Sequence, residues 1–410
     1  MAGDNALVTN KGGYSRNSNP SFLHVKSGNK IPLGQDSADD EKAPAQRSHY
    51  SSIDGLRTIS CISIIAMHIR ANTKYAIGMA GEVSDFLYNH FVPALTWLVY
   101  LFLMISGFGM CMGYLKCFQS GFQYNNQDNN GVDSHCIYLE TFYFKRYAKI
   151  LPFFGFLLAI ALLFEPNLTN FYEATMEVTL LHGLLPNNAM NVLGVCWTLG
   201  VIFMFYLLFP AFTVLMKSRK RAWMALAVSL WINFICQRYF FGEVYVTELF
   251  TPRHSFIYCL PLFIGGGIIY LYKNEIKGIC DCFRLGVLMG CLAGTVVYFL
   301  VERWMSYSSQ YYILLPLFML WLSYAVGVDS RVLGCRVMKY LSSISMEMYL
   351  AQMIIFRLIE KCGLLYVLGV GWTGFLMTLA LTVVGLIIFI ECYNEMIRVV
   401  EKAIKWLKQR

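Results

Sequence analysis

Three side chains that can move or stabilise charge share one face of the first apolar segment of the sequence. Asp54, Arg57 and His68 lie in SSIDGLRTISCISIIAMHI at residues 51–69. Arg57 and His68 are eleven residues apart, so their directions from a helix axis differ by only about 20°. Asp54 points about 40° from His68 on the other side. Imidazole can remove a proton at neutral pH, and a guanidinium can stabilise developing negative charge.

The same side chains allow two other interpretations. An Asp54–Arg57 pair can simply close the start of the helix, with His68 at the membrane interface. All three can instead form the substrate or proton relay of a polytopic secondary transporter. Inverted repeats would favour a transporter, and the two halves of this sequence show no similarity to each other.

The composition places these residues in a membrane protein. Of the 410 residues, 57% are hydrophobic and 14% charged, which excludes a large water-soluble enzyme. We predict an all-α, polytopic integral membrane protein with about ten transmembrane helices. The expected spans are the apolar runs at 51–70, 93–115, 149–165, 192–216, 222–241, 254–272, 284–301, 310–328, 340–359 and 370–393.

The length of the first span explains why its charges matter. Only twelve residues separate Arg57 from Arg70, about 18 Å of helix, which is too short to cross about 30 Å of hydrocarbon. The helix must therefore begin near Ser51, and Asp54 and Arg57 are drawn toward the membrane. Charges at such depth normally face a protein interior or a water-filled cavity.

Basic residues set the expected orientation. Lys and Arg gather in alternate loops, with the densest cluster at 217–221, so both termini are predicted to be cytoplasmic in a multi-pass protein of the cell membrane. The net charge of +8 is explained by this topology, and we expect the lipid bilayer as a partner but no nucleic acid. The segment 171–186 is short and polar, which favours a re-entrant or interfacial helix.

The two ends of the chain differ from its centre. Residues 1–47 are polar and predict a disordered tail, residues 48–395 form the membrane domain, and residues 396–410 predict a basic amphipathic helix on the inner membrane surface. Gly286, Gly290 and Gly294 predict a close helix–helix contact. The thirteen cysteines have no framework spacing, and the pair Cys280 and Cys282 is interpreted as thiols rather than a metal site.

Five segments, in order, resemble the membrane-bound acyltransferase family 3. They are the DGLR opening followed by Arg, ten residues and His, then LFLMISGF at 101–108, FYFKRYAKILPFF at 142–154, CWTLGVIFMFYLLFP at 196–210 and LSSISMEMYLAQ at 341–352. The similarity covers about residues 51–395. The chain departs from many members at Ile202 and Phe203, where they carry acidic residues, and at Gln352, where they often carry His.

The resemblance implies an O-acyltransferase that uses acyl-CoA, expected to be acetyl-CoA, as a donor substrate and holds no tightly bound cofactor. The acceptor would be a carbohydrate or lipid-linked glycan hydroxyl, as in O-acetylation of surface polysaccharides. His68 would be the general base, with Arg57 and Asp54 beside it in the catalytic group.

Further side chains are candidates for binding the two substrates. Lys145, Arg146 and Lys149 lie at the expected cytosolic side, where they can bind the phosphates of the CoA donor that the resemblance implies. Positive-inside anchoring is the alternative explanation for these residues. Trp197 and Arg253 can contact the acceptor, and packing or interfacial anchoring is the alternative for both. Further polar residues are given structural roles: Ser106 in a helix–helix hydrogen bond, and Arg357 paired with Glu391.

Overall fold

The computed structural model describes residues 50–75, 81–119, 139–185, 192–246, 250–367 and 369–409, so the predicted tail at 1–47 lies outside the described residues. The described residues are mostly helical and contain no strand, which confirms the all-α prediction. The α-helices, in chain order, are α1 (Ser51–Asn72), α2 (Glu82–Phe86), α3 (Val92–Ala94), α4 (Leu98–Met110), α5 (Lys116–Gln119), α6 (Leu139–Phe164), α7 (Leu168–Val178), α8 (Trp197–Leu215), α9 (Arg219–Ile235), α10 (Phe256–Leu271), α11 (Lys273–Val301), α12 (Tyr307–Gly327), α13 (Arg336–Ser343), α14 (Ser345–Lys361) and α15 (Gly371–Lys408).

Several of these helices are suited to a membrane. Seven described helices are long and apolar enough to cross one: Ser51–Asn72, Glu82–Gln119, Leu139–Phe164, Trp197–Leu215, Lys273–Trp304, Ser308–Gly327 and Gly371–Lys408. Three further predicted spans fall in α9, α10 and α14, which have only 16 or 17 residues. The chain is therefore a multi-pass membrane protein, while the count of ten spans and the cytoplasmic location of both ends remain predictions.

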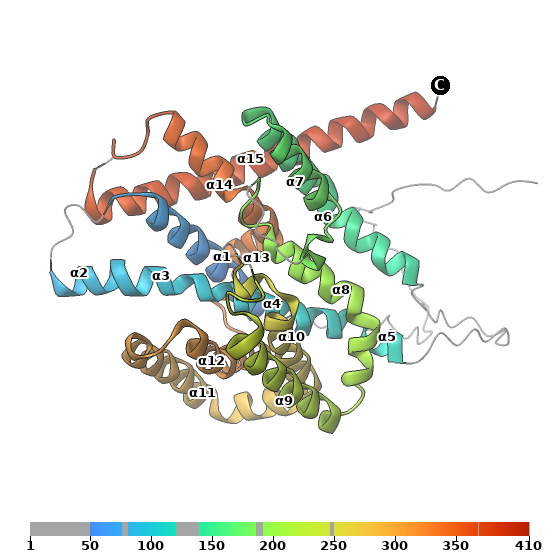
Figure 1. The fold of residues 1–410 in the computed structure, drawn as a ribbon, viewed down its shortest axis with the longest axis vertical. Coiled ribbons are helices and arrows are strands. Elements are labelled where there is room, and N and C mark those ends of the chain that lie inside the picture. Colours follow the sequence, from blue (N-terminus) through green and yellow to red (C-terminus); the bar gives the residue numbers. More distant parts are fainter. Residues whose placement is uncertain are drawn as a thin grey trace, which may run out of the picture. The chain divides into compact units, whose positions relative to one another are not determined.

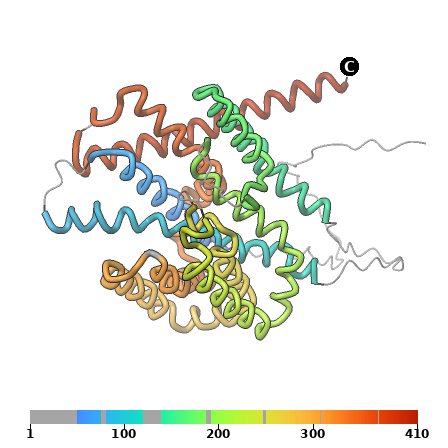
Figure 2. Tube along the Cα trace, viewed as in Figure 1, coloured from blue at the N-terminus to red at the C-terminus, as the bar shows by residue number. Residues whose placement is uncertain are grey.

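Helix α1 lies inside the helical unit formed by residues 50–409 (Figure 1, Figure 2). It contacts α4, α12, α13, α14 and α15. Two hydrogen bonds fix its height against α13: Thr58 Oγ1 donates to the Met338 carbonyl at 2.9 Å, and the Ser342 hydroxyl donates to Asp54 Oδ1 at 2.9 Å. Asp54 and Thr58 thus face protein, as the cost of polar groups in a membrane requires.

Glycines allow two pairs of helices to approach closely. A Cβ on Gly266 of α10 would collide with the Met104 carbonyl of α4, and one on Gly107 would collide with the Phe263 carbonyl. The predicted glycine contact is looser, because a Cβ on Gly294 would lie 3.0 Å from Leu317 of α12, and Gly286 meets only its own helix. Small residues therefore set the tightest crossing at α4–α10, a pair that the spacing of glycines in the sequence did not indicate.

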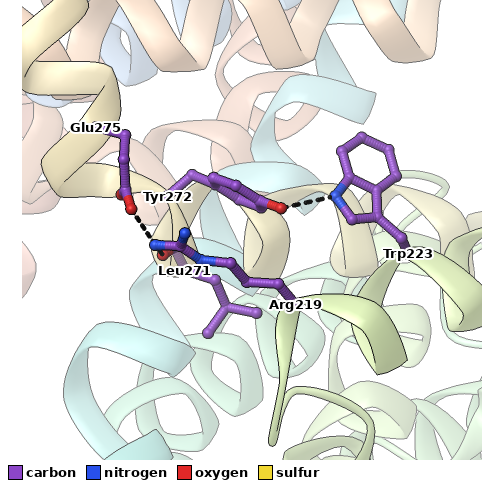
Figure 3. A network of polar contacts seen from close by, with 5 residues as sticks. All are labelled: Arg219, Trp223, Leu271, Tyr272 and Glu275. Atoms are coloured by element: carbon purple, nitrogen blue, oxygen red, sulfur yellow. Dashed lines mark hydrogen bonds and ion pairs between the residues drawn. The ribbon is translucent and has the colours of Figure 1, made fainter.

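The connection from α10 to α11 is held by an arginine from α9 (Figure 3). Arg219 donates to the Leu271 carbonyl at 3.4 Å, forms an ion pair with Glu275 and lies 4.4 Å from the ring centre of Tyr272. One residue of the predicted inner basic cluster thus caps the last carbonyl of α10. Helix α11 is kinked at Phe283 (φ −129°, ψ 37°), directly before the predicted span 284–301.

The structure also describes the short polar segment 171–186 and most of the basic segment after residue 395. Within 171–186, the described residues form the end of the short helix α7 and a 3₁₀ turn at His182–Leu184, neither long enough to cross a membrane. At the C-terminus, α15 continues as one helix from Gly371 to Lys408, so no break separates the last span from the basic residues after 395. The placement of residues 396–410 on the membrane surface remains a prediction.

Candidate active site

A cavity of about 250 Å³ lies between α1, α4, α6, α8, α13 and α14. The charged side chains that line it are Arg57, Arg146, Lys149 and Glu347, so three cations face one carboxylate. The hydroxyl groups of four serines, Thr198 and two tyrosines add hydrogen-bonding groups, and leucine, valine, isoleucine and phenylalanine side chains of α4, α6, α8 and α14 supply apolar wall. Such a mixture of cations and apolar surface suits an anionic ligand with an uncharged arm.

Arg57 enters the cavity from α1, and Asp54 lies one turn before it. Asp54 accepts a hydrogen bond from the Ser342 hydroxyl, and the charge of Asp54 acts on Arg57. A Cβ on Gly55 would collide with Leu333, so the small residue between them lets α1 approach the segment before α13. The pair therefore closes the start of the helix and still presents its guanidinium to the cavity.

Arg146 is surrounded by aromatic rings at the opposite wall. Its guanidinium carbon lies 4.7 Å from the ring centre of Tyr114, 5.1 Å from that of Tyr206 and 5.8 Å from that of Phe142. Rings at these distances attract the cation and fix its plane. Lys149, one turn further along α6, also lines the cavity, and the charges of Arg57, Arg146 and Glu347 act on it.

Lys145 does not belong to this cluster. Its side chain is exposed and it is not among the residues that line the cavity. The structure thus brings two of the three predicted donor-binding residues to the cavity and leaves the third on the surface.

His68 lies beyond one end of the cavity, two turns past Cys61 on α1. It is half-buried, does not line the cavity, and experiences the charge of Arg253. Arg253 Nη1 donates to Thr96 Oγ1 at 3.2 Å, and its guanidinium carbon is 5.6 Å from the ring centre of Trp197. The predicted catalytic pair is therefore divided: Arg57 is in the cavity, and His68 is grouped with Arg253.

Trp197 is part of a stack at this end. The ring of His254 lies parallel to it, with centres 4.7 Å apart and an angle of 19°. Trp197 itself is only 7% exposed, which means that its faces are largely occupied by protein.

The segment after α6 packs against the start of α8 through buried polar groups. His182 Nε2 lies 3.1 Å from the Cys196 carbonyl oxygen, and a Cβ on Gly200 would crowd the His182 ring. Burial raises the pKa of Glu177 to about 8, with nearby Glu173 adding to the effect. Its carboxyl group faces Cys196 and Leu193 without a well-formed hydrogen bond among the described residues.

Some side chains lie elsewhere than the sequence suggested. Ser106 donates to the Phe102 carbonyl of its own helix at 2.9 Å and lines the cavity, so the expected helix–helix bond is wrong. Arg357 pairs with Glu165 at 3.6 Å rather than with Glu391, which accepts from Tyr340.

The serines and Glu347 of the α13–α14 connection are site residues that sequence reasoning did not assign. The sequence contained a signal for them, because a carboxylate and three serines lie within the apolar stretch 341–352. Such polar groups are costly in a membrane unless they line a polar site. Among the described residues, no group of three metal-ligating side chains comes together.

One protein family matches this chain. The model of the type-3 acyltransferase domain matches residues 50–391, which is most of the chain. No match was found among curated proteins or among solved structures.

Proposed function

The chain belongs to acyltransferase family 3 and is an acyltransferase with several helices suited to crossing a membrane, and on that premise we propose that it moves a short acyl group from acyl-CoA to a hydroxyl of a cell-surface or lipid-linked glycan. The observation that carries the proposal is the cavity in which Arg57, Arg146 and Lys149 face one carboxylate. Guanidinium and ammonium groups bind phosphates through charge-assisted hydrogen bonds, and a CoA thioester supplies such phosphates.

The size of the cavity supports a short acyl group. About 250 Å³ is slightly below the range of about 300–1,000 Å³ that is usual for small-molecule sites. The apolar wall can hold the pantetheine arm and an acetyl group, while the adenine nucleotide remains at the mouth beside Lys149. A long acyl chain would need apolar volume beyond this space.

The reaction assigns a separate role to each end of α1. The acceptor oxygen attacks the thioester carbonyl, a C–O bond forms, and His68 takes the hydroxyl proton. The tetrahedral intermediate then releases the CoA sulfur as the C–S bond breaks, and the proton returns to that thiolate. Arg57 and His68 are separated by about 16 Å of helix rise, a distance that the extended pantetheine arm would cover. The alternative of a transporter is favoured by no feature of the described residues.

Replacement of His68 tests the proposal directly. His68→Ala should lower the transfer of radiolabelled acetyl from acetyl-CoA to membrane glycan about 100- to 10,000-fold, because a general base is lost. His90→Ala is a matched control, since it makes the same chemical change at an exposed side chain that does not line the cavity. Rates are compared per inserted protein molecule. Near-normal transfer by His68→Ala would remove His68 from the mechanism, and no transfer by the unmodified protein would contradict the proposed reaction itself.

A further inference from the structure

Gln352 is a buried polar side chain with no bonding role in the protein. It is 1% exposed, and among the described residues neither its amide oxygen nor its amide nitrogen has a hydrogen-bond partner. An amide offers two donors and one acceptor, and leaving them unbonded in a protein interior costs free energy. A buried amide without partners therefore indicates either a ligand or a site kept for one.

Helices α14 and α1 run side by side in the same direction, which locates Gln352. Near the start of α14, Cys61 Sγ of α1 donates to the Ser345 carbonyl at 3.4 Å. Beyond the ends of both helices, the Lys74 amide donates to the Tyr366 hydroxyl at 2.9 Å. The first contact sets the register of one helix against the other, and the second shows that both helices end on the same side.

The register brings Gln352 to the depth of His68. Each lies seven residues beyond the Cys61–Ser345 contact, which is about 10 Å of rise and two turns that return to within about 20° of the same face. Gln352 also follows Tyr349 by one turn, and both Ser345 and Tyr349 line the cavity. The stripe of α14 that lines the cavity thus continues beyond it to Gln352, just as the stripe of α1 continues from Arg57 to His68; neither Gln352 nor His68 lines the cavity itself.

A second buried donor belongs to the same end of the cavity. The charge of Arg253 acts on both His68 and Tyr349, so its guanidinium lies close to the two helices at this depth. Arg253 Nη1 is bonded to Thr96, but its buried Nε has no hydrogen-bond partner among the described residues. Unused donors and an unused acceptor therefore gather beside the predicted base.

We propose that Gln352 is a specificity-determining residue that binds the acceptor at the outer end of the cavity, an inference that rests on the proposed acyl transfer. Its amide accepts a hydrogen bond from one acceptor hydroxyl and donates one to a neighbouring hydroxyl, while Arg253 Nε donates to a further oxygen. Such a pattern fits a polyol with adjacent hydroxyl groups, one of which faces His68.

The test separates binding from packing by comparing two buried amides. Gln352→Met keeps the length of the side chain and removes its polar atoms, so the protein should be as stable as before or more stable. Transfer of radiolabelled acetyl to glycan extracted from the native membrane should fall about 10- to 100-fold, through the amount of extract needed for half-saturation. Binding of acetyl-CoA should not change, because the donor cations lie two or more turns away along α1 and on α6.

Asn233→Leu is the matched control. Asn233 is also fully buried, but its amide donates to the Tyr258 carbonyl at 2.8 Å and accepts from Tyr312 at 3.0 Å. This variant should lose thermal stability and keep normal transfer per folded molecule. Normal transfer by a stable Gln352→Met protein would overturn the inference, and so would a loss that appears only as a changed pH profile at unchanged half-saturation. Absence of transfer in the unmodified protein would refute the proposed function instead.

Discussion

The aromatic surroundings of Arg146 lead to a quantitative prediction about donor binding. Arg146→Gln removes a guanidinium that three rings hold at 4.7, 5.1 and 5.8 Å from their centres. A held guanidinium loses little freedom when phosphate binds, so most of its interaction appears as affinity. Hydrogen bonds to charged groups contribute about 1.5–3 kcal/mol, and the dissociation constant for acetyl-CoA should rise about 10- to 150-fold.

The neighbouring residue provides the control. Lys145→Gln removes the same charge one position away, but Lys145 is exposed and does not line the cavity. Its contribution should be screened by solvent, so affinity should change less than about threefold and the difference should vanish at high salt. Arg146→Lys should fall between the two variants, because it keeps the charge and loses the planar donors.

Equilibrium binding of radiolabelled acetyl-CoA to purified protein measures all three variants. Binding needs no knowledge of the acceptor, so the result does not depend on the reaction that follows. Equal dissociation constants for Arg146→Gln and Lys145→Gln, both with unchanged thermal stability, would refute the reasoning. Arg146 would then serve only topology and packing.

Two further predictions concern stability, measured by thermal unfolding in detergent. Gly266→Ala should destabilise the protein by about 1–3 kcal/mol, because its Cβ collides with the Met104 carbonyl. Gly155→Ala is the control and should not destabilise the protein, because Gly155 has open space around it. Equal effects of the two substitutions would contradict the close α4–α10 crossing. Glu177→Gln should stabilise the protein at pH 8 but not at pH 4. The pKa of Glu177 in the folded protein, about 8, exceeds the ordinary value of 4.5, so the free energy of unfolding falls as the pH rises between these two values. At about 1.4 kcal/mol per pH unit, the loss reaches up to about 5 kcal/mol. A gain that is the same at both pH values would show that the carboxyl does not titrate in this way.

The helices were predictable because their signal is local. Each of the ten apolar runs is mostly helical, since about 20 apolar residues leave a membrane segment no other way to satisfy its backbone. The run 340–359 is divided between α13 and α14 at Ile344, and the run 192–216 becomes helical only from Trp197. The end of the last helix was not predictable in the same way. Charges begin after residue 395, but a change of polarity does not break a helix, and no Gly or Pro follows Gly385 to end α15 before Lys408.

Contacts between distant segments were beyond the sequence. A run of glycines every four residues indicated a close approach at 286–294, yet the tightest crossing uses Gly107 and Gly266, which are far apart in the chain. Arg357 is paired with Glu165, the residue directly after α6, because α14 and α6 lie together, a fact that no spacing within α14 reveals. Single residues carry a charge or a small size, and only the packing of helices decides which partner they meet.

Asp54 and Arg57 show why a structural and a functional interpretation need not exclude each other. If the pair only closed the start of α1, the Arg57 guanidinium would bind the Asp54 carboxylate and nothing else. If the pair were purely functional, the Asp54 carboxylate would be available to the ligand. Instead, Asp54 accepts from Ser342 of α13, and that bond anchors α1 at the height where Arg57 reaches the cavity. Eleven residues of helix then separate Arg57 from His68, which lies at the depth of Gln352 on α14. Asp54, which fixes the position of α1, therefore also sets how far the proposed base lies from the cations proposed to bind the donor.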